Sequence, residues 1–103
     1  MTFVPVGRLP QVSTRVGLVI RGPIRRADLE ALSTRVCGFF ATHAGATVDC
    51  DVVGVDADAV TVDALARLQA VARRNGCVVV LRNASADLLA LVDLMGLTDV
   101  LPS

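Results

Sequence analysis

Five aspartates within fifteen residues are the densest group of chemically capable side chains in this sequence. Asp49, Asp51, Asp56, Asp58 and Asp63 fall in residues 49–63, a stretch that contains no Lys or Arg. Carboxylates gathered on a loop are the ligands that Mg²⁺ or Ca²⁺ requires. However, Asp49 and Asp51 alternate with Cys50 as strand residues do, and Asp56 or Asp58 is suited to cap a helix. We therefore expect no metal ion and no other cofactor.

The same carboxylates lack the partners that acid–base catalysis requires. No His, Lys or Tyr lies near them in the sequence, and the only histidine, His43, falls at an expected helix end. Glycine-rich phosphate-binding loops are also absent. Arg21, Arg25 and Arg26 could bind an anion or a partner, but a solvated basic turn is the simpler interpretation. We expect no catalytic residue, and hence a protein that is not an enzyme.

A helix that begins after residues 56–58 would give this acidic stretch a binding role. The first turn of a helix presents unpaired N–H groups and about half a positive charge, so it stabilises an aspartate and equally accepts a phosphate. Thr61 is the hydroxyl residue of that turn. A phosphate on it would add about two negative charges beside the aspartates and would repel a partner matched to the unmodified surface.

Composition limits the other possibilities. The chain has ten basic and ten acidic residues, which argues against nucleic-acid binding through phosphate neutralisation and against attraction to anionic membranes. Cys37, Cys50 and Cys77 are odd in number and widely spaced, so they predict buried free thiols, with no disulfide and no zinc site. All basic residues are Arg, a habit of GC-rich bacterial genomes.

The length of 103 residues, 53% of them hydrophobic, suits one soluble domain over residues 1–103. The longest apolar runs are the length of strands, well short of the roughly 20 residues that cross a bilayer. The start of the chain lacks a basic segment followed by an apolar one. We therefore expect a cytoplasmic location and no direct membrane insertion.

Apolar periodicity predicts the elements that position these residues. Residues 3–9, broken by Pro5 and Gly7 and followed by Pro10, can form at most an edge strand. Residues 16–20 alternate as a strand does, residues 47–53 are expected to form a central strand, and residues 77–81 an interior parallel strand.

Three amphipathic helices alternate with these strands. Their apolar stripes are Leu29, Leu32, Val36, Phe39 and Phe40; then Val62, Leu65, Leu68, Val71 and Ala72; and then Leu88, Leu89, Leu91, Val92, Leu94 and Met95. Ser85 is expected to cap the last helix, with Gly76 and Gly96 ending the second and third. The order predicts an α/β fold with a mixed, mainly parallel sheet of four to five strands and helices packed largely on one face.

The sequence resembles the STAS domain family, which is shared by sulfate transporters and bacterial anti-sigma factor antagonists. Ser85 to Leu88 and Leu94 to Leu101 are similar to the opening of the family's last helix and to its closing Gly-Leu-x-x-Leu/Ile. Residues 22–32 are similar to the family's Gly-x-Ile-Asp segment with its later Leu, so the resemblance covers most of the chain after residue 15. It implies the STAS fold.

The family's functional motif is Asp-Ser-Ser-Gly-Leu, whose first hydroxyl residue is phosphorylated by a partner kinase in the antagonists. Counting back from Gly76 places Asp58 on the Asp, Ala59 on the hydroxyl residue, Thr61 on the Gly and Val62 on the Leu. Alanine cannot accept a phosphoryl group, so Thr61 is the remaining phospho-acceptor candidate.

The resemblance implies one of two non-catalytic functions. The first is regulation of transcription as an anti-sigma factor antagonist, which would dock onto a kinase-like anti-sigma factor through the loop and helix at residues 56–68. The alternative is an accessory STAS subunit that braces the ATPase of a phospholipid-transport ABC complex. The expected partner-binding residues are Asp56, Asp58, Ala59, Thr61, Val62 and Leu65.

Overall fold

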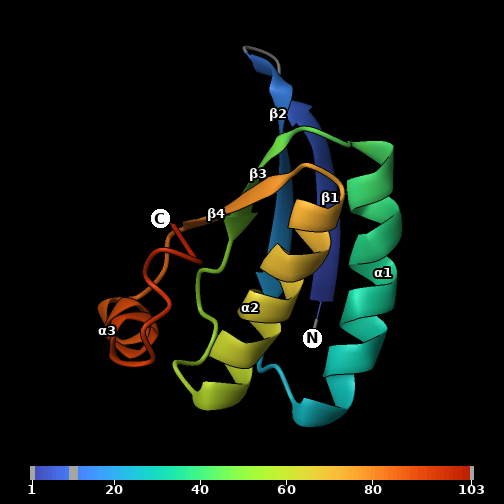
Figure 1. Ribbon diagram of the computed structural model, residues 1–103. Helices are drawn as coiled ribbons and strands as arrows, with labels where there is room; N and C mark the ends of the chain where they lie inside the picture. The colour runs from blue at the N-terminus through green and yellow to red at the C-terminus, as the bar shows by residue number, and fades with distance from the viewer. Residues whose placement is uncertain (1, 10–11, 103) are drawn as a thin grey trace.

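Strands and helices alternate along the chain as the periodicity predicts. The computed structural model describes residues 2–9 and 12–102, with side chains from residue 15 onward. The elements are β1 (Thr2–Leu9), β2 (Val12–Arg21), the 3-10 turn η1 (Arg26–Asp28), α1 (Leu29–Thr42), β3 (Thr47–Asp51), α2 (Ala59–Arg74), β4 (Val78–Arg82) and α3 (Ala86–Leu94). Figure 1 shows their arrangement.

The sheet has four strands in the order β1-β2-β3-β4. β1 runs antiparallel to β2, whereas β2 with β3 and β3 with β4 pair in parallel. Each parallel pair needs a crossover connection, and α1 and α2 supply the two. The α/β class and the mainly parallel sheet are therefore confirmed.

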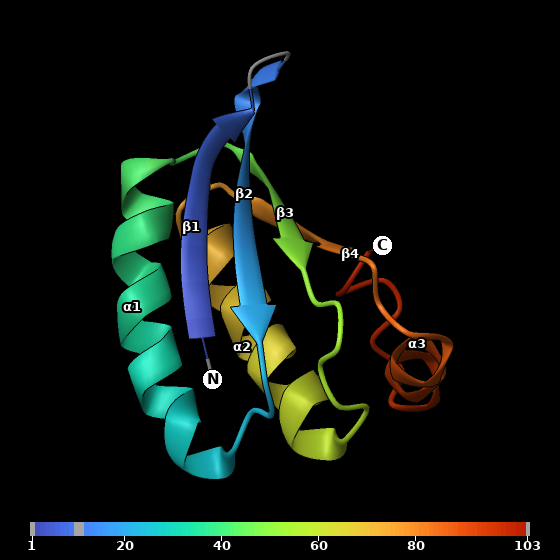
Figure 2. The ribbon, with the colours of Figure 1, turned by 180° about the vertical axis from the view of Figure 1, so that it is seen from behind.

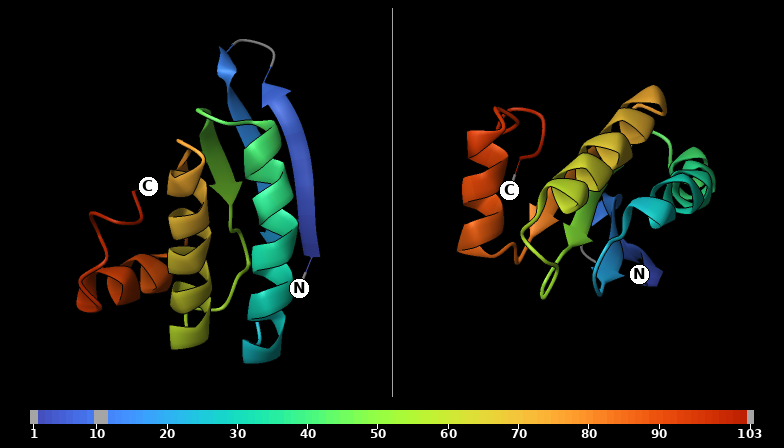
Figure 3. Two further views of the ribbon diagram at one scale, coloured as in Figure 1. Left: turned by 45° about the vertical axis from the view of Figure 1, so that its right-hand side comes forward. Right: turned by 90° about the horizontal axis from the view of Figure 1, so that it is seen from below.

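Helices α1 and α2 lie side by side on one face of the sheet, and no helix of the described residues covers the other face (Figures 1 and 2). The two views in Figure 3 show α3 beside this layer rather than on it. Alternate strand side chains meet the helices in one core, whose fully buried members include Val16, Leu18, Ile20, Val48, Val79, Val36, Phe40, Leu65 and Leu68. The expectation that helices cover largely one face is confirmed.

The buried stripe of α1 is the predicted one: Leu29, Leu32, Val36, Phe39 and Phe40. Spacings of three and four residues place these side chains on one side of a 3.6-residue helix. Cys37 lies off this stripe and is exposed, so the prediction of three buried thiols was wrong for Cys37 and right for Cys50 and Cys77. Burial, together with the charge of Asp51, raises the pKa of the Cys50 thiol to about 12.

β1 lies at one edge of the sheet, as Pro5 and Gly7 predicted. Its pairing with β2 shifts register between Pro5 and Gly7. A proline and an irregular register are features that discourage further strands from adding to an exposed edge.

The prediction that residues 77–81 form an interior strand was wrong, because β4 lies at the other edge of the sheet. Three of its outer backbone groups are nevertheless paired. Val79 N–H donates to Gln69 Oε1 at 2.8 Å, Val79 C=O accepts from Gln69 Nε2 at 2.9 Å, and Leu81 N–H donates to Pro102 C=O at 2.8 Å. An apolar sequence is compatible with this edge because a helix side chain and the C-terminal segment replace a fifth strand.

Candidate docking surface

The loop from β3 to α2, residues 52–58, emerges at the carboxyl end of β3. Val52 and Val55 are buried and anchor it, whereas Val53 and Gly54 between them are exposed. The turn closes with Val55 N–H donating to Val52 C=O at 3.2 Å, and Gly54 takes a φ of 75°, a conformation that favours glycine. The apolar anchors hold the remainder of the loop outward.

Helix α2 begins after one of the two predicted cap residues, Asp56 and Asp58, and Asp58 is the N-cap. The Asp58 backbone is extended, and its Oδ1 accepts the Thr61 N–H at 2.8 Å. Asp56, Ala57, Asp58 and Ala59 are all exposed. We call these four residues the acidic rim.

The six predicted partner-binding residues separate into two groups. Asp56, Asp58 and Ala59 lie on the surface, in the acidic rim. Thr61, Val62 and Leu65 are each 0% exposed. Val62 and Leu65 share the inner stripe of α2 with Leu68, so their side chains support the surface from within and do not form part of it.

Thr61 differs from its apolar neighbours because its hydroxyl is buried without a hydrogen-bond partner among the described residues. Burying a hydroxyl in this way costs about 1–3 kcal/mol relative to a paired one. A kinase could reach this oxygen only after the first turn of α2 had moved. Ala59, which the family resemblance predicts to occupy the position of the family's hydroxyl residue, is exposed.

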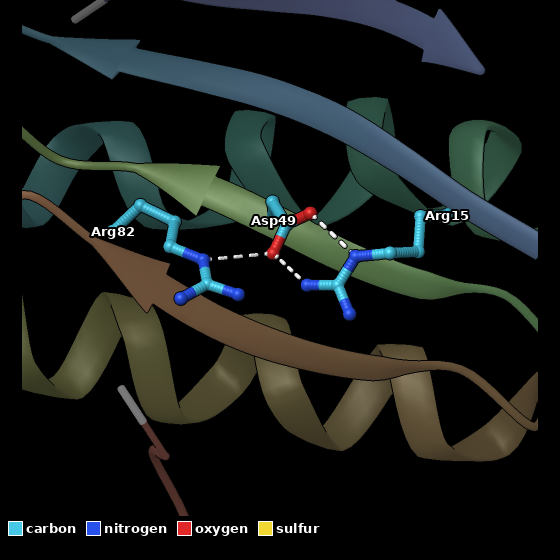
Figure 4. Close-up of polar contacts among 3 residues, drawn as sticks. All are labelled: Arg15, Asp49 and Arg82. Carbon is cyan, nitrogen blue, oxygen red and sulfur yellow. Dashed lines mark hydrogen bonds and ion pairs between the residues drawn. The ribbon is translucent and has the colours of Figure 1, made fainter. Parts of the chain in front are cut away.

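Asp49 lies on the open face of the sheet, away from the acidic rim. As Figure 4 shows, it sits between Arg15 of β2 and Arg82 of β4. Arg15 Nε donates to Asp49 Oδ2 at 3.0 Å, Arg15 Nη2 also bonds to Oδ1, and Arg82 Nε donates to Oδ1 at 2.9 Å. Partial burial alone would raise the pKa of Asp49, but hydrogen bonds and charge from both arginines outweigh it and lower that pKa.

Asp51 is held in a similar way at the end of β3. Its Oδ1 accepts the Val53 N–H at 3.0 Å and lies 3.6 Å from Arg21 Nη1. Burial raises its pKa, but hydrogen bonds from the Val53 backbone, Asn83 and Arg21, with the Arg21 charge, leave the pKa below its ordinary value. Asp49 and Asp51 therefore form ion pairs with arginines at the sheet and are not part of the acidic rim.

The described residues contain no group of three or more His, Cys, Asp or Glu that could hold a metal ion. The surface of the described residues has several hollows, of which two are large. One, of about 690 Å³, lies between α1 and α2 and includes Cys37 and Arg74; the other, of about 460 Å³, lies beside α3 and includes Asp93. Neither hollow pairs a carboxylate with a His, Cys or Lys, the arrangement that acid–base chemistry would need.

Two features of the structure were not predicted from the sequence. Gln69 is 0% exposed and bonds both to β4 and, at 2.7 Å, to Val100 C=O. Leu94, which was predicted to belong to the packed apolar stripe of the last helix, is 82% exposed, so that prediction was wrong for Leu94. The second had a signal in the sequence, because α3 is apolar on more of its circumference than one packed side can bury. A lone Gln within an apolar stripe gives no comparable signal.

None of the helices in the described ranges has the length and apolar character that crossing a membrane would require. A family model described as "Mlab, STAS domain" matches residues 8–102, nearly the whole chain. No curated protein matches the chain.

Proposed function

The chain belongs to the STAS domain family, and on that basis we propose that it is a non-catalytic regulatory module of the anti-sigma factor antagonist type. STAS domains generally mediate protein–protein interactions. In the proposal, the exposed part of residues 56–68 docks onto a kinase-like anti-sigma factor. The observation that carries it is the exposure of the acidic rim at the segment that corresponds to the family's functional motif.

The chemistry of the acidic rim suits a protein contact. Asp56 and Asp58 form no ion pair with any base among the described residues. Ala57 and Ala59 are small and let a partner backbone approach closely. Further along α2, Asp63 and Arg67 form an exposed ion pair at 3.2 Å that extends this surface with charges of both signs. Unneutralised carboxylates favour a partner with a complementary basic patch and steer its approach.

The buried core beneath the rim makes the surface firm. Val62, Leu65 and Leu68 fix α2 against the sheet, and the Asp58 cap fixes its first turn. A preorganised surface loses little conformational freedom on binding, which improves affinity. A specific complex would bury about 1,200–2,000 Å² in total.

The alternative function, an accessory subunit that braces the ATPase of a phospholipid-transport ABC complex, has one observation in its favour. Ala59 is exposed at the position of the family's hydroxyl residue, and the Thr61 hydroxyl is buried. Both features favour docking that is not controlled by phosphorylation of this helix turn. A constitutive brace needs no such control.

Capture from the native bacterium, followed by reconstitution with purified partner, tests the proposal. Wild-type protein should retain a kinase-fold anti-sigma factor, and Asp56→Arg and Ala59→Arg should each weaken the purified complex at least about tenfold. Arg35→Glu, an exposed charge reversal on α1, is the matched control and should leave affinity unchanged. Equal affinity in all four proteins would contradict docking through the acidic rim.

Incubation of the complex with ATP separates the two functions. Phosphate on Thr61, absent in Thr61→Val, supports the switched antagonist. Recovery of a transporter ATPase with no phosphate on the chain supports the accessory subunit. Turnover of a small molecule by the purified protein would contradict both.

A further inference from the structure

The surface of α3 and its C-terminal cap exposes an unusual amount of apolar side chain. Leu89 is 38% exposed, Leu94 82% and Met95 42%. Only Leu88 and Val92 of the helix are buried. Among the described residues, the other large exposed apolar side chains are Val53 and Val78, which lie elsewhere. Exposed large apolar side chains concentrated on one short helix and its cap are characteristic of an interaction site.

Beside this helix is a preformed hollow of about 460 Å³, lined by Leu89, Val92, Asp93, Thr98, Leu101 and Pro102. Hydrogen bonds hold its walls in place. Thr98 Oγ1 donates to Asp93 Oδ1 at 3.1 Å, and Pro102 C=O accepts from Leu81 N–H at 2.8 Å. Leu101 itself is only 2% exposed. A firm, mostly apolar hollow of this kind accommodates the anchoring side chain of a partner.

The charged side chains of α3 and the segment after it have one sign. Residues 83–103 contain Asp87, Asp93 and Asp99 and no Lys or Arg. No base among the described residues forms an ion pair with any of the three. An apolar centre bordered by unpaired carboxylates has the core-and-rim arrangement of a protein interface. It would repel an anionic membrane and a nucleic acid, and it complements a basic partner.

The location agrees with such a role. α3 contacts α2, and Figures 1 and 3 show it beside the half of α2 that begins at the acidic rim. Asp56 and Asp58 of the rim carry the same charge as the border of the α3 surface. One basic partner could therefore contact both.

We propose that the surface formed by α3 and the following hollow binds a cationic, apolar segment of the protein partner. A Leu- or Phe-type side chain of that segment occupies the hollow, and an Arg or Lys lies against Asp93. Leu94 and Met95 cover the apolar face of the segment. This inference rests on the proposed function, because it adds a second contact to the docking of the same partner.

The test uses the full chain and an 18-residue synthetic helical peptide of Leu and Arg, with a Leu and Glu peptide of the same pattern as the charge control. We expect the Leu and Arg peptide to bind by calorimetry, with affinity falling at least about tenfold in Leu94→Ser and also in Asp93→Asn. Val78→Ser is the matched control, since Val78 is 43% exposed on the sheet, and it should bind as wild type does. The Leu and Glu peptide should not bind.

Folding does not obscure the result, because Leu94 is largely exposed and its replacement leaves no cavity. Equal peptide binding by wild type and Leu94→Ser would overturn the inference. So would self-association that sedimentation shows to depend on Leu94, or binding to phosphatidylglycerol vesicles that Leu94→Ser abolishes. If the captured partner is lost by Asp56→Arg and retained by Leu94→Ser, the proposed function stands and this inference fails. If Leu94→Ser loses the peptide and Asp56→Arg keeps the partner, the inference stands and docking through the acidic rim fails.

Discussion

Helix α2 buries one polar side chain near each end, and the two differ in how they are accommodated. Gln69, toward the C-terminal end, is 0% exposed and makes three hydrogen bonds, to Val79 N–H, Val79 C=O and Val100 C=O. Thr61, near the N-terminal end, is equally buried, and its hydroxyl has no partner among the described residues.

The buried amide of Gln69 has a clear structural role, whereas the buried hydroxyl of Thr61 has none among the described residues. Gln69 completes the outer edge of β4 and ties the C-terminal segment to it, so its burial contributes to stability. The Thr61 hydroxyl makes no described contribution, and it lies in the turn that bears the acidic rim. An unsatisfied buried group of this kind calls for an explanation other than its contribution to stability.

The largest expected effect comes from removing the paired group. Gln69→Leu should lower the free energy of unfolding by about 3 kcal/mol, because it leaves three backbone groups of β4 and the C-terminal segment unpaired. Denaturation by urea measures this change. Arg74→Leu, an exposed position on the same helix, should stay within about 0.5 kcal/mol of wild type. A Gln69→Leu protein as stable as wild type would show that these groups find other partners.

Removing the unpaired group should act in the opposite direction. Thr61→Val keeps the shape of the side chain and eliminates the orphan hydroxyl, so it should raise the free energy of unfolding by about 1 kcal/mol. Thr61→Ser retains the hydroxyl and loses a methyl group, so it should be less stable than wild type. Destabilisation by Thr61→Val would reveal a hydrogen-bond partner for the hydroxyl in solution and would remove the contrast with Gln69.

In contrast to the Thr61 hydroxyl, the Asp58 side chain should stabilise the first turn of α2. Asp58→Ala should cost about 1 kcal/mol, because the Thr61 N–H loses its acceptor at 2.8 Å. Asp56→Ala, its neighbour in the rim, should remain within about 0.5 kcal/mol of wild type. Thermal unfolding of the two variants measures the difference, and equal losses would mean that the rim stabilises the helix through charge alone.

The stability contributed by Asp49 and Asp51 on the open sheet face should depend on pH, whereas the effects of replacing Gln69 and Thr61 should not. The pKa values of Asp49 and Asp51 are lowered in the folded protein, so the stability that these residues contribute is present above about pH 4 and is lost as pH falls through the folded pKa values. The difference in stability between wild type and Asp49→Asn should therefore shrink in acid. Gln69 and Thr61 do not titrate, so the effects of Gln69→Leu and Thr61→Val should persist there. An Asp49→Asn difference independent of pH would contradict the ion-paired arrangement.

Local patterns allowed much of the fold to be predicted. The buried stripe of α1 matched at every position, and Asp58 and Ser85 cap α2 and α3 as expected. Such features depend on residues within a few positions of one another. The position of β4 could not be predicted in this way, because a strand buried by neighbours and one closed by Gln69 and Pro102 can have the same apolar sequence.

The candidate site likewise has some features that local sequence predicts and others that depend on tertiary contacts. The sequence by itself determined the acidic stretch, the start of the helix after it and most of the inner stripe of α2, since charge, capping and periodicity are local properties. Val71 of the predicted stripe is only partly buried. Tertiary structure alone decided that Asp49 and Asp51 are paired with arginines on the open sheet face, that Thr61 is buried and that Leu94 is exposed. Those outcomes depend on which distant segments pack together, because side-chain burial and ion pairing arise from contacts between elements that the order of residues does not specify.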